Sequence, residues 1–427
     1  MEQLKESGIE WIGDIPKNWA VHPVFTYFCE RKKKNTNFSE RNLLSLSYGT
    51  IKRKNIDSNN GLLPKNFASY NIVECGDIVI RPTDLQNDKK SLRTGLVTEK
   101  GIITSAYITL CPLKNVNSRF FHYLLHSYDV QKVFYNMGNG VRQCLNYSEF
   151  SKLLLLAPTL IKQEKIANFL DNKCSEIDSL ATDIQKEISI LEEYKKSVIT
   201  DAVTKGIVQN VEMKNAKINW IGKIPKTWTI SRLKFLLKEK MKYGASESGV
   251  DYSAELPRYV RITDILPNNK LKDENKLSLT KEQSKGFILE DGTVLFARSG
   301  GTVGKTFLYN SEMGVAAYAG YLISAVANSF VLLPEWLFYF SLSRPYLTWV
   351  ELIFSQSTIQ NINADKYSNM PLTLPPIEEQ KSICLFLKNK CSEIDKSISE
   401  KQSQLEILAE YKNSLIYEYV TGKKEVI

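Results

Sequence analysis

A glycine-rich stretch at residues 299–306, SGGTVGKT, comes nearest in this chain to a known catalytic motif. A phosphate-binding loop needs an earlier glycine, which is missing here, and a helix directly after the loop whose N-terminus binds phosphate. The residues that follow, Thr306–Tyr309, have a strand-like pattern instead. We therefore predict a glycine turn that lets the backbone approach a bound molecule, and no nucleotide hydrolysis.

Other patterns that could do chemistry are weak. His122 and His126 share one helix face, but further metal ligands are not evident nearby, so we interpret them as a histidine pair at a packing interface. Seven scattered cysteines without a Cys-x-x-Cys pair favour reduced, structural thiols. Adenine methylation would need an Asn/Asp-Pro-Pro-aromatic motif, and here isoleucine follows Pro375-Pro376. We therefore expect no catalytic site, metal or cofactor in this chain.

The basic excess is unevenly distributed along the chain. Of the net charge of +9, residues 1–161 carry +7 and residues 206–378 carry +4, whereas residues 162–205 carry −2 and residues 379–427 are neutral. This distribution is expected if the two basic segments meet nucleic-acid phosphates and the other two meet protein. A solvated surface with a mild basic bias is the alternative.

Arginine, asparagine and glutamine are the side chains that read base edges, whereas lysine-rich runs hold phosphate without specifying sequence. The candidate base contacts of the first basic segment are Arg81, Lys89, Lys90, Arg93, Arg142, Gln143 and Asn146. Those of the second are Arg258, Arg261, Arg298, Gln356, Gln360, Asn361 and Asn363, with Lys305 in the glycine turn as a further DNA contact. Candidate phosphate contacts are Arg31, Lys32, Lys33, Lys34, Arg53 and Lys54. For any single residue, a structural or solvated role is the alternative.

Two long helices are predicted to position these segments. Leu170, Ile177, Ile184, Leu191 and Val198 recur every seven residues, with Ile166, Lys173, Leu180, Glu187 and Tyr194 as the expected companion series. Leu387, Ile394, Leu408 and Leu415 form the second stripe, which Lys401 interrupts beside Ile398 and Leu405. Such spacing predicts an antiparallel coiled coil; packing of each helix on its own neighbouring domain is the alternative.

The basic segments read as mixed α/β domains, which makes the predicted class α+β. Strands are predicted at residues 43–48, 78–81, 94–97 and 102–110 of the first segment, and at 259–262, 293–298, 306–309 and 321–327 of the second. Helices are predicted at 118–137 and 334–353, the latter broken at Pro345. The expected boundaries are 1–161 for the first domain, 162–205 for its helix, 206–378 for the linker and second domain, and 379–427 for the second helix and tail.

Two blocks of the sequence each occur twice in the chain. Residues 9–19, IEWIGDIPKNW, return 209 residues later as INWIGKIPKTW, and the block at 162–178 returns 217 residues later at 379–395. The segments between these blocks, 20–157 and 229–374, share little identity. We infer one scaffold that carries two different binding domains.

These motifs resemble the DNA-specificity subunits of type I restriction–modification systems. The resemblance rests on the two WIGxIPxxW sequences, the PPIEEQ lead-in at 375–380, and the phrases RYVRITDI at 258–265 and FARSGGTVGK at 296–305. It covers essentially the whole chain. The first domain departs from it, since Val79-Ile80-Arg81-Pro82 stands where the second has Phe296-Ala297-Arg298. The equivalence of Arg81 and Arg298 is therefore open.

The resemblance implies a non-catalytic subunit in which each domain reads one half of a split double-stranded DNA target and the paired helices fix the gap. It implies two methyltransferase subunits as partners, with two restriction subunits where the system includes them. S-adenosylmethionine, ATP and Mg are then expected in those partners. Without an apolar run of roughly 20 residues or a signal-peptide pattern, we expect a cytoplasmic protein. A self-sufficient methyltransferase and a coiled-coil scaffold without nucleic acid are the alternatives.

Overall fold

The computed structural model describes residues 3–57, 66–83, 85, 91–137, 144–355 and 361–426. The chain forms two compact units, which are described separately. Unit 1 comprises residues 1–184 and 404–427, and unit 2 comprises residues 185–403. Each unit therefore holds one variable segment together with part of both long helices.

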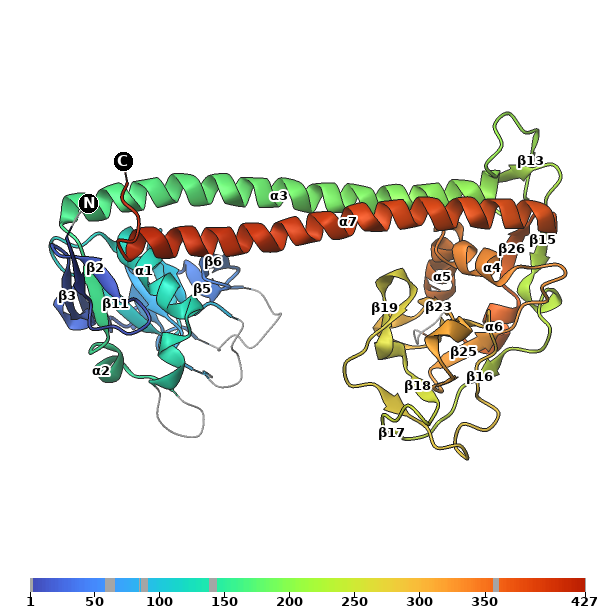
Figure 1. Ribbon diagram of the computed structural model, residues 1–427, viewed down its shortest axis with the longest axis horizontal. Helices are drawn as coiled ribbons and strands as arrows, with labels where there is room; N and C mark the ends of the chain where they lie inside the picture. Colours follow the sequence, from blue (N-terminus) through green and yellow to red (C-terminus); the bar gives the residue numbers. More distant parts are fainter. Residues whose placement is uncertain are drawn as a thin grey trace. The chain divides into compact units, whose positions relative to one another are not determined.

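Unit 1 is built from short strands and two short helices before its long helix (Figure 1). Its strands are β1 (Leu4–Glu6), β2 (Asp14–Pro16), β3 (Ala20–Pro23), β4 (Phe28–Glu30), β5 (Leu43–Ser47), β6 (Thr50–Lys54), β7 (Asn71–Val73), β8 (Ile78–Ile80), β9 (Thr94–Leu96), β10 (Gly101–Ile103), β11 (Ile108–Pro112) and β12 (Leu154–Ala157). Its helices are α1 (Ser118–Val130), α2 (Tyr147–Phe150) and the first part of α3 (Leu160–Lys205).

Unit 2 repeats this plan with additional short strands. Its strands are β13 (Met213–Asn215), β14 (Lys223–Pro225), β15 (Thr229–Arg232), β16 (Lys242–Tyr243), β17 (Val250–Asp251), β18 (Arg258–Val260), β19 (Ile265–Leu266), β20 (Lys270–Leu271), β21 (Leu277–Ser278), β22 (Val294–Ala297), β23 (Thr306–Leu308), β24 (Ala316–Tyr318), β25 (Leu322–Ala325) and β26 (Pro371–Leu374). Its helices are α4 (Pro334–Ser341), α5 (Arg344–Ser355), α6 (Ala364–Ser368) and most of α7 (Ile377–Val420).

The two units share a sheet topology despite their different residues. The strand order β4-β11-β8-β9 in unit 1 corresponds to β16-β25-β22-β23 in unit 2, and both sheets pair antiparallel. A second four-stranded sheet in each unit contains one parallel pair, β5 with β10 and β18 with β24. These sheets and the long helices confirm the predicted α+β class and the shared fold of the two segments.

Three predicted elements differ in detail. The strand expected at 102–110 is two strands, β10 and β11, because a turn with a Tyr107-to-Thr104 backbone bond separates them. The helix expected at 118–137 ends at Val130 and continues as a 3-10 turn. The helix expected at 334–353 is α4 and α5, and the break falls before Pro345, which occupies the first turn of α5 where its missing N–H costs nothing.

Residues of the duplicated motif pack in equivalent ways in the cores of both units. Trp19 and Trp228 are fully buried and make edge contacts with Phe120 and Trp336 respectively. These aromatic contacts fix the duplicated motif against α1 in unit 1 and against α4 in unit 2. The repeat is therefore a repeated core rather than a repeated surface.

Two buried glutamines show the same equivalence. The side-chain carbonyl of Gln163 accepts the backbone N–H of Asn117 (3.0 Å), and that of Gln380 accepts the backbone N–H of Leu333 (2.9 Å). Asn117 and Leu333 are the N-cap residues of α1 and α4, so each glutamine satisfies a group at a helix start. This explains why glutamine recurs at the start of both long helices.

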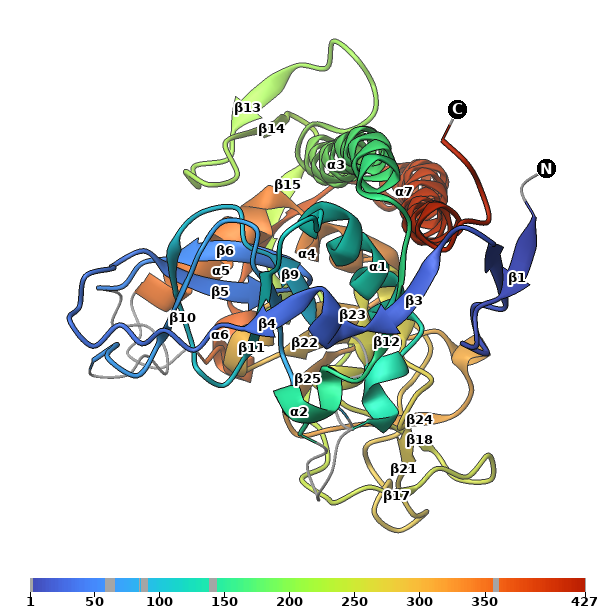
Figure 2. The same cartoon turned by 90° about the vertical axis from the view of Figure 1, so that its left-hand side faces the viewer.

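Helices α3 and α7 lie side by side and antiparallel within each unit (Figures 1 and 2). In unit 1 Lys412 pairs with Asp178 (2.6 Å), and in unit 2 Lys195 pairs with Asp395 (2.7 Å). Asp178 and Asp395 are 217 residues apart, as are Lys195 and Lys412, so the two ion pairs are copies of one another. Each ion pair therefore joins an aspartate of one copy of the repeat to a lysine of the other copy.

The seven-residue stripes lie on the inner faces of these helices. Leu170, Ile177, Ile184, Leu387, Ile394 and Leu415 are buried, and Leu191, Val198 and Leu408 are half-buried. Around Lys401 the stripe is continued by buried Ile398 and half-buried Leu405.

The companion series expected on α3 is confirmed at Ile166, which is buried, and is wrong farther along the helix. Leu180 and Tyr194 are exposed, whereas Ala167, Cys174 and Ile188 are buried. The companion positions follow the main stripe by four residues instead of three. Small side chains occupy several of these companion positions. The hydrophobic pattern alone therefore did not identify the face of α3 that packs against α7.

Both long helices end on a glycine against a tryptophan. Gly206 and Gly422 have φ of +78° and +72°, a conformation that glycine adopts at helix ends without strain. A Cβ at Gly206 would lie 3.4 Å from the Trp228 ring, and one at Gly422 would lie 3.3 Å from the Trp19 ring. The end of α3 therefore packs in unit 2 and the end of α7 packs in unit 1.

Within the described ranges, no helix combines the length and the apolar character that crossing a membrane requires.

Candidate nucleic-acid interface

The arginines of unit 2 differ in whether a carboxylate already neutralises them. Arg261 donates from Nε and Nη2 to Asp264 (3.0 and 2.8 Å), and this bonding raises the pKa of Arg261. Arg258 lies 3.8 Å from Asp273 and also donates to the carbonyl of Lys272. Both guanidinium groups are largely committed to holding loops around β18.

Arg298 has a different environment. It follows β22, its backbone N–H donates to Tyr321 (3.0 Å), and its carbonyl accepts from Ile362 (2.9 Å). Within the described residues its guanidinium has no carboxylate partner and stacks over the ring of Tyr243 at 4.9 Å. Arg298 is therefore held in place and keeps its charge for a ligand.

The asparagines predicted nearby fall into two roles. Asn363 is the N-cap of α6, where its side chain accepts from the N–H of Lys366 (2.9 Å). Asn361 forms a backbone bridge with Ser299, and its side-chain oxygen is buried without a partner within the described part of the chain. Asn361 thus lies beside Arg298, whereas Asn363 has a structural task.

The glycine-rich stretch forms a turn. Gly300–Thr302 is a single 3-10 turn, and β23 follows it. Lys305 is exposed at the end of that turn. The strand in place of a helix N-terminus removes the geometry that a phosphate-binding loop requires.

The strand register answers whether Arg81 and Arg298 are equivalent. Ile80 on β8 pairs with Thr94 on β9, and Phe296 on β22 pairs with Thr306 on β23. Since β8 and β22 occupy the same place in their sheets, Ile80 corresponds to Phe296.

One residue further on, Arg81 corresponds to Ala297 and Pro82 corresponds to Arg298. The backbone hydrogen bonds agree with this alignment. The N–H of Arg81 donates to the carbonyl just before β9, and the N–H of Ala297 donates to the carbonyl just before β23. Arg81 and Arg298 are therefore not equivalent. Unit 1 has a proline where unit 2 has its stacked arginine.

Arg93 is fully buried and cannot contact DNA in this structure. Its Nη1 donates to the carbonyl of Thr83 (2.6 Å), its Nε donates to the hydroxyl of Tyr135 (3.1 Å), and its guanidinium lies over the Tyr135 ring. These bonds satisfy the charge inside the domain. We therefore leave Arg93 out of the candidate interface.

The basic run at residues 31–34 is only partly available. Arg31 forms an ion pair with buried Asp77 (2.6 Å), and Lys32 pairs with Glu30 (2.8 Å). Lys34 donates to the carbonyl of Ser69 (2.9 Å). Lys33 is exposed.

The other basic positions of unit 1 lie on or near strands. Arg53 on β6 forms a two-point ion pair with Glu99, and the next residue, Lys54, is exposed. Asn146 caps α2 by accepting from the N–H of Glu149 (3.0 Å). The predicted contacts Lys89, Lys90, Arg142, Gln143, Gln356 and Gln360 lie outside the described residues.

The two histidines lie in the interior of unit 1. Burial lowers the pKa of His122 to about 3, and it also lowers the pKa of His126, whose Nε2 is 3.1 Å from Oδ1 of Asn413 on α7. Within the described ranges, no group of three potential metal ligands comes together. His126 therefore packs α1 against α7, whereas Nε2 of His122 is buried without a partner in the described part of the chain.

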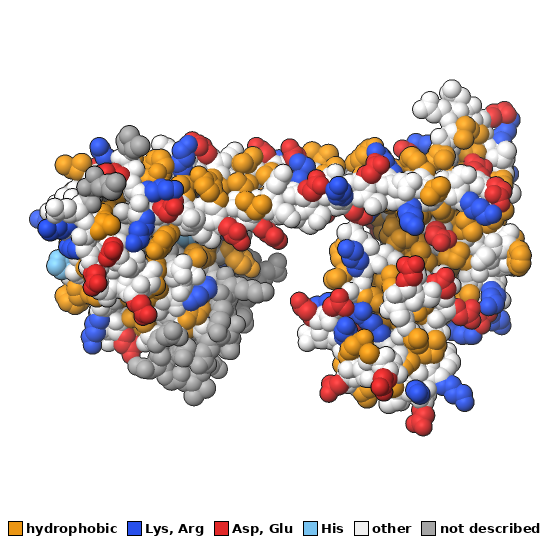
Figure 3. Space-filling view, in the orientation of Figure 1, with side chains coloured by type: hydrophobic (Ala, Val, Ile, Leu, Met, Phe, Trp, Pro, Cys, Tyr) orange, Lys and Arg blue, Asp and Glu red, His pale blue; other side chains and the backbone are white. Residues whose placement is uncertain are grey.

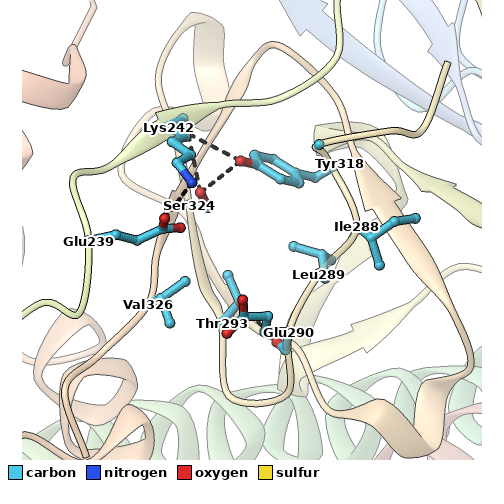
Figure 4. Close-up of a pocket in the computed structure, with 10 residues that line it drawn as sticks. Glu239, Lys242, Ile288, Leu289, Glu290, Thr293, Tyr318, Ser324 and Val326 are labelled. Carbon is cyan, nitrogen blue, oxygen red and sulfur yellow. Dashed lines mark hydrogen bonds and ion pairs between the residues drawn. The ribbon is translucent and has the colours of Figure 1, made fainter. Parts of the chain in front are cut away.

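A polar pocket in unit 2 lies apart from Arg298. Figure 4 shows Lys242, Glu239, Tyr318 and Ser324 around a cavity of about 230 Å³. Lys242 and Tyr243 are neighbours on β16, and successive strand residues point to opposite faces. The pocket and the stacked arginine therefore occupy opposite sides of the sheet.

Apolar side chains are exposed along the long helices, as orange atoms in Figure 3 show. Ile190 and Tyr194 on α3 are 66% and 48% exposed, and Ile407 and Tyr411 on α7 are 63% and 55% exposed. Each residue of one pair is 217 positions from its counterpart in the other. Unit 1 and unit 2 thus each present the same small apolar patch.

Two features of the candidate sites could not be predicted from the sequence. Tyr243 stands in no motif, and only the sheet brings it to Arg298. The repeat of Ile190 and Tyr194 at 407 and 411 was visible in the duplicated block, but helix spacing alone did not show that these residues face outward.

Comparison with known proteins supports one family. A family model described as "Type I restriction modification DNA specificity domain" matches residues 210–406. The chain is 23% identical to the putative type I restriction enzyme MjaX specificity subunit of Methanocaldococcus jannaschii, over 97% of this chain and 96% of that protein. It is 24% identical to the type I restriction enzyme EcoBI specificity subunit of Escherichia coli, over 62% and 57% of the two chains.

A solved structure shares the fold. The chain described as "Structural basis underlying complex assembly and conformational transition of the type I R-M system" aligns with a TM-score of 0.65 at 14% identity, over 96% of this chain and 99% of that one. Residues 210–406 therefore match a type I restriction–modification DNA specificity domain, and the chain as a whole is similar to the specificity subunits of such systems.

Proposed function

We propose that this chain selects the DNA target of a type I restriction–modification complex and leaves catalysis to its partners. The observation that carries the proposal is the duplicated framework around two domains of one topology and different surface residues. Arg298 in unit 2 against Pro82 in unit 1 is the clearest difference. Two domains of one fold with different side chains at matched positions are suited to reading the two different halves of one target.

The proposed interface excludes buried Arg93. In unit 2 it centres on Arg298, Asn361 and Lys305, with Arg258, Arg261 and Asn363 supporting the surrounding loops. In unit 1 it includes Arg81, Asn146 and the phosphate contacts Arg31, Lys32, Lys33, Lys34, Arg53 and Lys54. The six predicted residues outside the described ranges remain candidates on sequence grounds.

The helices have two proposed tasks. A stiff antiparallel pair can set the length of the unspecific gap, which a flexible linker cannot do. Two copies of one apolar patch fit two copies of one partner, so we assign them to two methyltransferase subunits. The solved relative's own description, which concerns complex assembly, supports an assembly of this kind.

The remaining assignments follow from this function. The proposed divisions are residues 1–161 and 206–378 for the two recognition segments and 162–205 and 379–427 for the helices. Methyl transfer with S-adenosylmethionine, and ATP- and Mg-dependent cleavage where a restriction subunit is present, belong to partner subunits. DNA modification of this kind would act in the cytoplasm.

Co-expression with the cognate methyltransferase subunit tests the proposal. Methylome sequencing should reveal methylated adenines in a two-part motif with a fixed gap. An active complex without such a motif would count against the proposal. Methylation by the purified chain alone would favour a self-sufficient enzyme, and salt-insensitive DNA binding by the complex would favour a scaffold, because phosphate contacts weaken steeply with salt.

A further inference from the structure

Tyr243 and Arg298 meet although they belong to different strands. Tyr243 is on β16 and Arg298 follows β22, and β25 lies between these strands in the sheet. The centre of the guanidinium is 4.9 Å from the centre of the tyrosine ring. Arginine stacks on aromatic faces because its delocalised charge is attracted to the π electrons.

Both members of the pair are anchored. The hydroxyl of Tyr243 accepts the backbone N–H of Ala364 (3.1 Å), the first residue of α6. The backbone of Arg298 is bonded on one side to Tyr321 and on the other to Ile362. The tyrosine ring and the backbone that carries the guanidinium are therefore both held in place.

Stacking leaves the hydrogen-bonding edge of Arg298 available. The guanidinium carbon lies over the tyrosine ring, and guanidinium N–H groups donate within their own plane. Arg298 Nε and Asn361 Oδ1 are both buried without a partner within the described part of the chain. Buried donors and acceptors left open in this way are costly unless a ligand completes them.

We propose that Tyr243 is a positioning residue that orients Arg298 for reading a guanine edge in the second half of the target. This inference rests on the proposed function, since it assumes that unit 2 reads DNA. Arginine reads guanine through two parallel hydrogen bonds to O6 and N7, which demand a defined plane. Unit 1 has Pro82 at the position that corresponds to Arg298. The tyrosine–arginine pair would therefore act only on the second half of the target.

Two substitutions separate the ring from the hydroxyl. Tyr243→Phe keeps the ring and removes the bond to Ala364, whereas Tyr243→Gln removes the ring and leaves a shorter polar side chain. Each would be tested in the complete complex with the methyltransferase subunit, beside Arg298→Ala. The measurements are the methylated motif in cells and the methylation rates of DNA substituted at each position of both halves.

Tyr243→Phe should keep the wild-type motif. Tyr243→Gln should lower discrimination by about tenfold, a typical effect of losing a well-placed cation–π contact, at the one position of the second half that Arg298→Ala also relaxes. All other positions, including the whole first half, should keep their discrimination. Unfolding midpoints close to wild type for both variants show that unit 2 is intact.

Unchanged discrimination in Tyr243→Gln at the position that Arg298→Ala relaxes would overturn the inference. So would equal loss in Tyr243→Phe and Tyr243→Gln, because that would assign the effect to the hydroxyl and α6. Arg298→Ala without any relaxed position would remove the pair from base reading. A wild-type complex that methylates without a two-part motif would instead overturn the proposed function.

Discussion

At the scale of single residues, charge type alone does not mark a contact surface. Arg258, Arg261, Arg31 and Arg53 all face carboxylates, and Arg93 is buried. An arginine held by a carboxylate must give up that partner before it can bind a base or phosphate. Availability therefore depends on partners that lie far away in the sequence.

The burial of His122 predicts an acid-sensitive unit 1. Desolvation by burial lowers its folded pKa to about 3 from an ordinary value of 6.5. The unfolded chain therefore binds a proton below pH 6.5 that the folded chain does not, and stability falls as the pH drops through that window. The loss reaches about 2 kcal/mol by pH 5, at about 1.4 kcal/mol per pH unit.

His122→Asn, which is neutral at every pH, should show a shallower loss of stability between pH 7.5 and pH 5. Urea unfolding at several pH values measures this slope. Part of the slope should remain, because burial lowers the pKa of His126 as well. An identical slope in variant and wild type would contradict the assignment to His122.

The candidate site was predictable in outline but not in its details. Arg298 stands in a family-like phrase and could be named from sequence, as could the glycine turn. The burial of Arg93 could not, because an arginine before a strand has the same local pattern whether its side chain turns in or out. Tyr243 could not be found because its contact with Arg298 crosses a sheet.

At the scale of elements, the long helices were the most predictable part of the fold. Their seven-residue stripes are local patterns, and neither glycine nor proline interrupts them. The companion stripe was misplaced because a heptad allows a partner three or four residues away. Cys174 and Lys195 at the true seam do not look apolar enough to decide between the two.

The ion pair between Lys195 and Asp395 gives a test of helix register. Lys195→Asp places two carboxylates together and should lower the free energy of unfolding by about 1–2 kcal/mol. Adding Asp395→Lys restores an opposite-charge pair and should recover about half of that loss. Urea unfolding of the four members of this cycle measures the coupling.

Lys196→Asp is the matched control. Lys196 is the next residue on α3, and its partner Glu193 is on the same helix. Its stability change should not depend on residue 395. Absence of any coupling between positions 195 and 395 would contradict the helix register that this ion pair indicates.

At the scale of the whole molecule, the repeat predicts how many partners assemble. Ile190→Lys and Ile407→Lys each place a charge in one of the two matching apolar patches. Either substitution should leave one methyltransferase subunit bound instead of two, and the double substitution should leave none, because a buried lysine without a partner opposes docking. Native mass spectrometry of the purified complex counts the subunits.

Leu180→Lys provides the comparison for that experiment. Leu180 is an exposed apolar residue of α3 whose counterpart in the repeat is Ser397, so it belongs to no duplicated patch. The Leu180→Lys complex should keep both methyltransferase subunits. Two subunits retained in the double variant would show that docking occurs elsewhere.

Unit 1 is built from two separate stretches of the chain, and unit 2 lies between them in the sequence. The two units therefore become complete at different times during synthesis. Unit 2 is a continuous stretch, residues 185–403, whereas unit 1 needs residues 404–427, including Gly422 beside Trp19. A ribosome that has released residue 403 has supplied everything unit 2 requires, while the domain translated first still lacks its closing helix. Residues 1–184 are thus completed after unit 2, and Trp19 stays incompletely covered until residues 404–427 have been made.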